Sequence, residues 1–143
     1  MQIAQIFTDF TDSYMTDFLY KEEGYKIIGC FYTVYNTLGH GFLESVYLEA
    51  LSKEFEKNMI PYIREEKIDV FYQDEKLKKY FKADFLCYND IIIEVKAEKF
   101  TSRASKEQVL NYLKASNHKV AYLVNFGSDK IYIKRFINTP KSV

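Results

Sequence analysis

The chain has 143 residues, of which 48% are hydrophobic and 28% charged, a balance typical of one globular domain and not of a disordered chain. Twenty Lys and Arg residues balance twenty Asp and Glu residues, which argues against a protein coated with cations for non-specific nucleic-acid binding. The two cysteines, Cys30 and Cys87, form no CxxC pair, which argues against a disulfide framework or a zinc site.

The N-terminal region lacks the features of a targeting or membrane segment. Its first 17 residues include three aspartates and no basic residue, unlike a signal peptide. No stretch of the chain approaches the roughly 18 apolar residues that span a membrane. We therefore expect a cytoplasmic protein with no membrane partner. Residues 1–20 are expected to form an arm or an extra helix, and residues 21–143 a single domain.

Apolar residues recur at helical spacing in the first half of the chain, over residues 25–38 and again over residues 43–57. Gly39, His40 and Gly41 separate these two predicted helices, and Gly39 suits a left-handed helix end. Pro61 ends the helical region. The sequence therefore predicts a pair of consecutive helices before any strand.

The middle and the end of the chain favour strands. Residues 63–72, 77–87 and 91–95 are predicted strands, and the run Ile91, Ile92, Ile93 is typical of a strand covered on both faces. Residues 105–116 return to helical spacing, and residues 120–125 and 131–137 are two further strands. The order α-α-β-β-β-α-β-β predicts an α/β (α+β) sandwich with a mixed sheet.

The pattern of an acidic residue, any residue and then Lys occurs three times in the chain. One occurrence, Glu94-Val95-Lys96, stands out because it directly follows the apolar run Ile91, Ile92, Ile93. Glu94 and Lys96 share one face of that strand, so an ordinary ion pair at a strand end is one interpretation. Asp84 supports another, because a hairpin between the two strands would bring it beside Glu94. Two converging carboxylates either share a proton or bind a cation such as Mg²⁺.

Asp84 followed by Glu94-Val95-Lys96 resembles the catalytic signature of the PD-(D/E)XK nuclease superfamily, which has a restriction-endonuclease-like core. Within it, the motif that names the GxxExxY family resembles residues 41–47, Gly-Phe-Leu-Glu-Ser-Val-Tyr. The resemblance continues through residues 25–29, 80–85, 108–115 and 125–127, and it covers about residues 20–137.

The resemblance implies a role for each matching residue. Asp84, Glu94 and Glu44 would bind Mg²⁺ or Mn²⁺, with the backbone carbonyl of Val95 as a further ligand, and Lys96 would position or activate the attacking water. Gln108 and Tyr112 match the Q-x-x-x-Y element of RecB-like nucleases, at a spacing that puts both on one helix face. They would brace the site or contact a nucleic-acid strand.

Several of these residues also have structural interpretations. Glu44 suits the start of any helix, Gln108 suits an exposed surface, and Tyr47 and Tyr112 suit a hydrophobic core. The chain also departs from the family pattern, since Tyr35 stands where members commonly have a His. His40 and His118 are expected in loops, without a role as ligand or base.

The resemblance implies a metal-dependent nuclease that hydrolyses phosphodiester bonds, with DNA as the expected nucleic acid and a homodimer or protein partner enlarging a small binding surface. The alternative is a catalytically silent nuclease-fold module. The neutral total hides an asymmetry: residues 1–75 carry a net charge of −8 and residues 76–143 a net charge of +8. Folding either disperses these charges or presents a basic side to phosphates.

Overall fold

The structure is a computed structural model, and it describes residues 19–138. Its elements follow the predicted order of two helices, three strands, a helix and two strands. They are α2 (Lys21–Leu38), α3 (Glu44–Lys57), β1 (Tyr62–Tyr72), β2 (Glu75–Cys87), β3 (Ile91–Lys96), α4 (Arg103–Ala115), β4 (Val120–Asn125) and β5 (Tyr132–Ile137). The expected arm over residues 1–20 lies almost entirely outside the described residues.

Two helices begin earlier than their apolar spacing indicates. Helix α2 starts at Lys21, and the apolar spacing does not indicate this start because the first turn is charged. Glu22 and Glu23 in that turn complement the helix dipole. Helix α4 starts at Arg103 because Ser102 caps it, accepting a hydrogen bond from the Ser105 backbone N–H at 3.1 Å. Local electrostatics and capping set these two ends.

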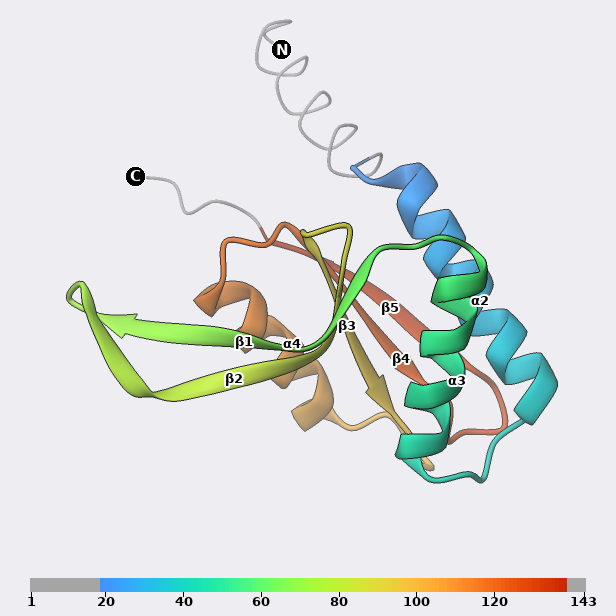
Figure 1. Ribbon diagram of the computed structural model, residues 1–143. Helices are drawn as coiled ribbons and strands as arrows, with labels where there is room; N and C mark the ends of the chain where they lie inside the picture. The colour runs from blue at the N-terminus through green and yellow to red at the C-terminus, as the bar shows by residue number, and fades with distance from the viewer. Residues whose placement is uncertain (1–18, 139–143) are drawn as a thin grey trace, which may run out of the picture.

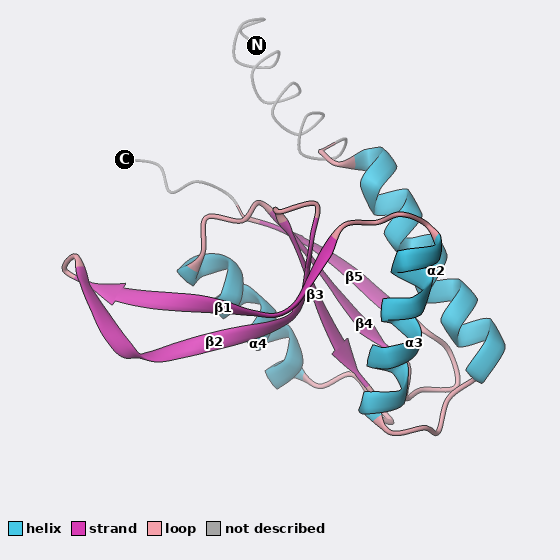
Figure 2. Cartoon of the chain, viewed as in Figure 1, coloured by secondary structure: helices cyan, strands magenta, loops and turns pink. Residues whose placement is uncertain are grey.

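The five strands form one sheet in the order β1-β2-β3-β4-β5 (Figure 2). The β3–β4 pair is parallel and the other three pairs are antiparallel. Helix α4 makes the crossover that a parallel pair requires. The predicted mixed sheet is therefore confirmed.

Helices cover both faces of the sheet. In Figure 1, α2 and α3 lie on one side of β3 and β4, and α4 lies on the other. Alternate side chains of β3 enter the two cores: Ile91 and Ile93 join the core under α2 and α3, and Ile92 joins the core under α4. The predicted strand covered on both faces is confirmed. Glu94 comes directly after Ile93 in this strand.

The thiols of Cys30 and Cys87 are free and buried. Burial raises the pKa of Cys30 to about 11. Among the described residues, no helix is both long and apolar enough to cross a membrane.

The hairpin of β1 and β2 extends well beyond the rest of the sheet (Figure 1). Its two strands pair from Tyr62 opposite Cys87 out to Tyr72 opposite Glu75, whereas β2 pairs with β3 only from Phe85 to Cys87. Gln73 and Asp74 both have positive φ angles, as a tight hairpin turn requires. We call residues 67–82 the outer hairpin.

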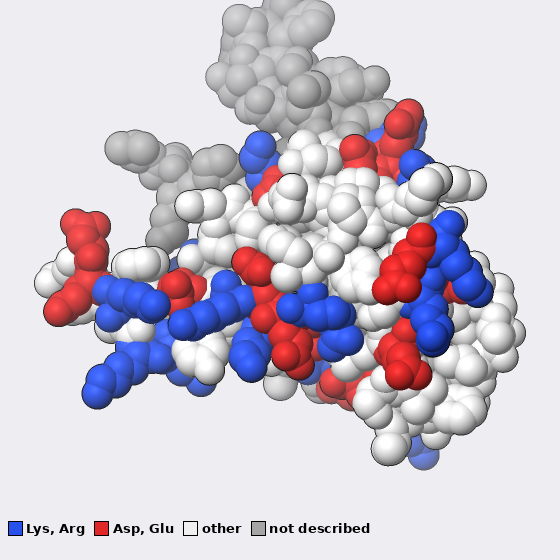
Figure 3. Space-filling view, in the orientation of Figure 1, with Lys and Arg blue, Asp and Glu red and all other residues white. Residues whose placement is uncertain are grey.

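Charge is unevenly distributed over this shape. Figure 3 shows that Lys and Arg side chains predominate along the projecting hairpin, and acidic side chains gather at its outer end. The outer hairpin holds five lysines and three acidic residues. Part of the basic excess of the second half of the chain is therefore presented together on one element.

Candidate metal centre and nuclease-like site

Asp84 and Glu94 lie side by side where β2 and β3 separate. Phe85 pairs with Ile93 in the last ladder position of these antiparallel strands, so the next residue outward on each strand faces the other. The hairpin predicted from the short connection is confirmed, and it brings the two carboxylates together.

Each of the two carboxylates is held by a backbone group of the neighbouring strand. The Asp84 N–H donates to Glu94 Oε1 at 2.8 Å, and the Val95 N–H donates to Asp84 Oδ2 at 2.8 Å. These bonds continue the ladder after the main-chain pairing has ended. A side-chain hydrogen bond also joins Asp84 and Glu94, so the two carboxyl groups are in direct contact.

Burial makes this pair of carboxylates hard to ionise fully. Glu94 is only 3% exposed, and its burial, together with the charge of Asp84, raises its pKa well above the ordinary value. Burial also raises the pKa of Asp84, although the hydrogen bond from Val95 and the charge of Lys96 lower it. Two such carboxylates need a shared proton or a cation between them.

Lys96 lies two residues after Glu94 at the end of β3 and is half-buried. Its charge lowers the pKa of Asp84, Glu94 and Glu44, yet it forms no direct ion pair with a carboxylate of the described chain. A cation that lies near acids without pairing with them directly remains available for a phosphate or a water.

Glu44 approaches the same centre from α3, at the first turn of that helix. Burial of its carboxylate and the charges of Asp84 and Glu98 raise its pKa, although the residue as a whole is exposed. Within residues 19–138, no three His, Cys, Asp or Glu side chains converge as a metal-binding group. Glu44 therefore faces the centre without joining the two carboxylates.

The donor chemistry of the centre suits a hard divalent cation. Mg²⁺ and Mn²⁺ prefer oxygen ligands, and Mg²⁺ is commonly held by one or two carboxylates with water completing its coordination. Asp84 and Glu94 supply such a pair. Val95, whose backbone carbonyl is the further ligand implied by the resemblance, lies between Glu94 and Lys96 and pairs with Val124 of β4.

Gln108 and Tyr112 lie on the face of α4 that covers this centre. Tyr112 is buried, and the charges of Glu94 and Asp84 add to that burial in raising its pKa to about 12. A hydrogen bond from Gln108 acts in the opposite direction. The Gln108 side-chain oxygen is buried and has no hydrogen-bond partner among the described residues, and Gln108 lines the same cleft as Lys96.

Arg64, which no sequence pattern indicates, belongs to the same centre. Its Nε donates to the Asp84 backbone carbonyl at 3.0 Å, and its guanidinium lies 4.7 Å from the centre of the Phe85 ring. Its charge also lowers the pKa of Asp84. The signal is visible only in the strand register, where Arg64 is directly opposite Phe85.

A second missed group fixes the loop that follows β3. Asn125 is fully buried, and its side chain bonds the Glu98 N–H at 2.8 Å and the Glu98 carbonyl at 3.0 Å. The Glu98 carboxylate accepts hydrogen bonds from Ser102 and Ser105 at the start of α4. A cleft of about 260 Å³ lies between this loop and α4, lined by Lys96, Glu98, Ser102, Ala104, Ser105 and Gln108.

Two residues of the motif over residues 41–47 have structural roles. Gly41 has a φ of 109°, which favours glycine. Tyr47 is fully buried, stacks on Phe126 with ring centres 4.7 Å apart, and donates to the Gly39 carbonyl at 2.6 Å. Tyr47 therefore packs in the core, in line with its structural interpretation.

Tyr35 and the two histidines also have defined positions. Tyr35, at the position where the resemblance led us to expect a His, donates to the Ser128 carbonyl at 2.7 Å. His118 contacts Asp90 at 3.3 Å. His40 lines a hollow with Lys99 and Asp129. None of these three residues is among the groups that shift the pKa of Asp84 or Glu94.

Comparisons with known proteins identify the superfamily of the chain and a similar fold. A family model described as the PD-(D/E)XK nuclease superfamily matches residues 21–136. The solved structure titled "Crystal structure of SSO0001" has a similar fold, with a TM-score of 0.53 and 18% identity over 68% of this chain. This chain spans about half, 52%, of that protein. No curated protein matches the sequence. The chain belongs to the PD-(D/E)XK nuclease superfamily.

Proposed function

We propose that this protein is a divalent-metal-dependent nuclease that hydrolyses phosphodiester bonds, with DNA as its substrate. The observation that carries the proposal is the pair of Asp84 and Glu94, whose carboxylates are aligned by reciprocal backbone bonds near the charge of Lys96. The superfamily to which the chain belongs supports it. The site residues we propose are those two carboxylates, Lys96 and Glu44.

In this proposal, Asp84 and Glu94 would hold Mg²⁺ or Mn²⁺ through their carboxylate oxygens, and Glu44 and the Val95 carbonyl would complete or support the coordination. When bound, the ion supplies charge neutralisation at the phosphate and polarisation of the attacking water. Lys96 orients that water or binds a phosphate oxygen. Arg64 holds Asp84 in place through its backbone carbonyl.

Gln108 and Tyr112 complete the wall of the site on the side of α4. The unsatisfied Gln108 oxygen accepts a hydrogen bond from the attacking water or from the substrate. The Tyr112 hydroxyl stays protonated near neutral pH, since its pKa is raised to about 12. It is therefore a hydrogen-bond donor and not a base.

The direct test is cleavage of single-stranded, duplex and branched DNA, and of RNA, with Mg²⁺ or Mn²⁺. We expect the wild-type protein to cleave DNA, and the Asp84→Ala and Lys96→Ala variants to lose that activity. Lys53→Ala is the matched control, since Lys53 is an exposed lysine of α3. Activity that persists in both site variants would identify a contaminant and overturn the proposal.

Two finer assignments belong to the same proposal. We place the chain in the GxxExxY group, supported by the three named positions of its motif, Gly41, Glu44 and Tyr47. We also propose that a homodimer or a protein partner extends the substrate surface of so small a domain. Sedimentation with and without DNA tests the second point directly.

A catalytically silent module is the second candidate. One observation favours it: no three potential ligands converge in the described part of the chain. Such a module would bind nucleic acid or a protein without turnover. Isothermal titration with Mn²⁺ separates the candidates, because the nuclease must bind the ion and the silent module shows no heat of binding.

A further inference from the structure

The outer hairpin carries a row of side chains that leads away from the carboxylates. Alternate residues of a strand project from the same side, so Tyr80 and Lys82 share the side of β2 on which Asp84 lies. Lys78 lies further out on β2, where the pairing with β1 shifts between Asp69 and Phe71, and it is exposed. On β1, Lys67 is directly opposite Lys82, and its Nζ lies 4.6 Å from the centre of the Tyr80 ring. We call these four residues, Lys67, Lys78, Tyr80 and Lys82, the basic strip.

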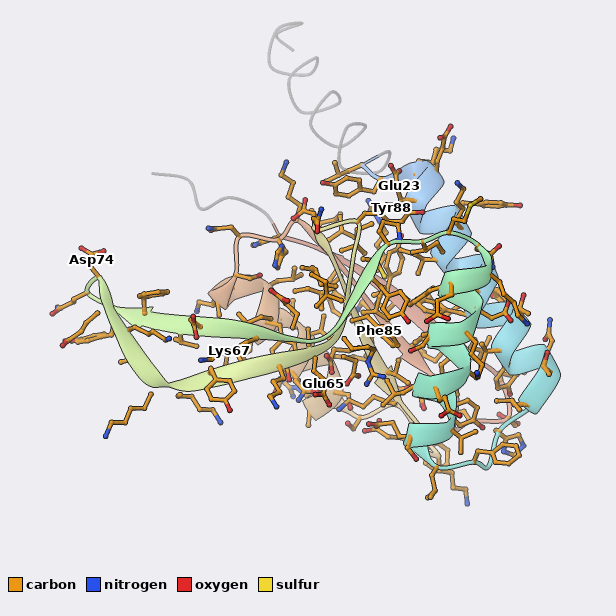
Figure 4. All side chains as sticks on the ribbon, viewed as in Figure 1. Glu23, Glu65, Lys67, Asp74, Phe85 and Tyr88 are labelled. Atoms are coloured by element: carbon orange, nitrogen blue, oxygen red, sulfur yellow. The ribbon has the colours of Figure 1, made fainter. Side chains whose placement is uncertain are left out.

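The basic strip is exposed because the opposite side of the hairpin is the anchored one. Phe81 packs on Tyr112 of α4 with ring centres 5.1 Å apart, and Ile68 is buried in the same core. The four residues of the basic strip are all exposed. Figure 4 shows the hairpin from Glu65 at its base through Lys67 to Asp74 at its tip.

The charges of the basic strip are not balanced within the described chain. Lys67 and Lys76 share a single acidic partner, Asp69, at 3.6 and 3.7 Å. Lys78 and Lys82 form no ion pair with any residue of the described ranges. Placing Lys67 directly opposite Lys82 is unfavourable, since like charges on paired strands repel. An anion lying on the strip would remove that cost.

From these observations we propose that the basic strip binds the sugar–phosphate backbone of duplex DNA and guides it to the carboxylates of Asp84 and Glu94. The proposal rests on the proposed nuclease function and adds the path of the substrate. From Asp84 to Tyr80 the regular part of the strand spans about 13 Å, which corresponds to about four base pairs of duplex DNA at ~3.4 Å each.

A second copy of the chain is the competing occupant of this surface. Two copies related by a twofold axis would present the same patch to each other, so the lysines of one strip would face the lysines of the other. A polyanion suits the strip and a second strip does not. The lysines contact phosphates and read no base sequence.

The test is binding of a fluorescent duplex of about 20 base pairs at several salt concentrations in EDTA, where nothing is cleaved. The variant is Lys78→Gln/Lys82→Gln. The matched control is Lys26→Gln/Lys53→Gln, which removes the same charge from exposed positions of α2 and α3. Each lost phosphate contact lowers the slope of log Kd against the logarithm of the salt concentration by about 0.9. We therefore expect a decrease of about 1.8 for the hairpin variant and none for the control.

The inference would be overturned if the two double variants lost DNA affinity equally, or if neither lost any. It would also be overturned if the wild type did not bind the duplex. A hairpin variant that changes sedimentation of the free protein but not DNA binding would assign the strip to a second copy. Because the assay contains no metal, its result is independent of cleavage. A protein that binds through the strip but never cleaves would contradict the proposed function and leave the inference standing.

Discussion

The side chains of Asp84 and Glu94 each accept a hydrogen bond from the backbone of the neighbouring strand. The Asp84 N–H donates to the Glu94 carboxylate, and the Asp84 carboxylate accepts from Val95, the residue after Glu94, both at 2.8 Å. The two bonds extend the β2–β3 ladder by one step after Phe85 and Ile93. The carboxylates are therefore positioned by the backbone of the sheet, which is a rigid support for a metal site.

Replacing Asp84 should separate its structural role from its catalytic one. Asp84→Asn keeps a side-chain oxygen for the Val95 N–H, so we expect stability within about 1 kcal/mol of the wild type. Asp84→Ala leaves that N–H without a partner and should cost about 1–3 kcal/mol. Both should reduce cleavage at least about 100-fold, since even residues that only support metal ligands commonly matter that much. Thermal unfolding and cleavage rates check the two expectations. An Asn variant with wild-type activity would remove Asp84 from the site.

Glu94 should make the metal-free protein more stable in acid than at neutral pH. Its folded-state pKa is raised by burial and by Asp84, so its contribution to stability is full below the pKa of the unfolded chain and is lost as the pH rises through the folded pKa. Glu94→Gln keeps the oxygen for the Asp84 N–H and removes the charge. We expect it to stabilise the protein by about 1–3 kcal/mol at pH 7 in EDTA and to flatten the pH dependence. Denaturant unfolding from pH 4 to pH 8 measures both effects, and a less stable variant at pH 7 would contradict them.

Gln108 should show a trade-off between stability and activity. Its buried side-chain oxygen has no hydrogen-bond partner within residues 19–138, and an unsatisfied buried acceptor costs about 1–3 kcal/mol. Gln108→Met keeps the size of the side chain and removes the polar group, so we expect higher thermal stability together with slower cleavage. Glu107→Met, at the neighbouring exposed position of α4, is the control. If Gln108→Met were both less stable and fully active, the oxygen would have no role in the site.

Two glycines should respond to alanine in opposite directions. A Cβ on Gly127 would lie 2.3 Å from the Glu98 backbone nitrogen, in the loop fixed by Asn125. Gly127→Ala should therefore destabilise the protein by about 1–3 kcal/mol or more and slow cleavage by displacing the loop after Lys96. Gly29 lies within α2 with nothing within 4 Å of a Cβ, so Gly29→Ala should stabilise by about 0.5–1 kcal/mol. Chemical denaturation of the two variants gives the sign of each change.

Most of the fold could be predicted because its elements carry strong local patterns. The Ile91–Ile93 run indicated the central strand, and Gly39 and Gly41 separated the two helices as expected. The first turns of α2 and α4 were missed because helix starts depend on charge and capping more than on apolar spacing. The expected arm over residues 1–20 stays a prediction.

The site could be predicted only in part, for physical reasons. Asp84, Glu94 and Lys96 could be found because a strand places alternate residues on one face and a hairpin pairs its neighbours. Arg64 could not, since its position depends on the register of β1 against β2. Asn125 supports the loop through contacts about 27 positions away in sequence, which no local pattern contains. The roles of Glu44, Gln108 and Tyr112 in catalysis stay predictions.

The central claim is that Asp84 and Glu94 together bind a divalent cation. Anomalous diffraction from crystals soaked in Mn²⁺ tests it most directly. We predict one strong peak about 2.1 Å from an oxygen of each of the two carboxylates, and no such peak in crystals of Asp84→Asn. A Mn²⁺ peak elsewhere, or a pair of carboxylates that stays empty at saturating Mn²⁺, would contradict the account.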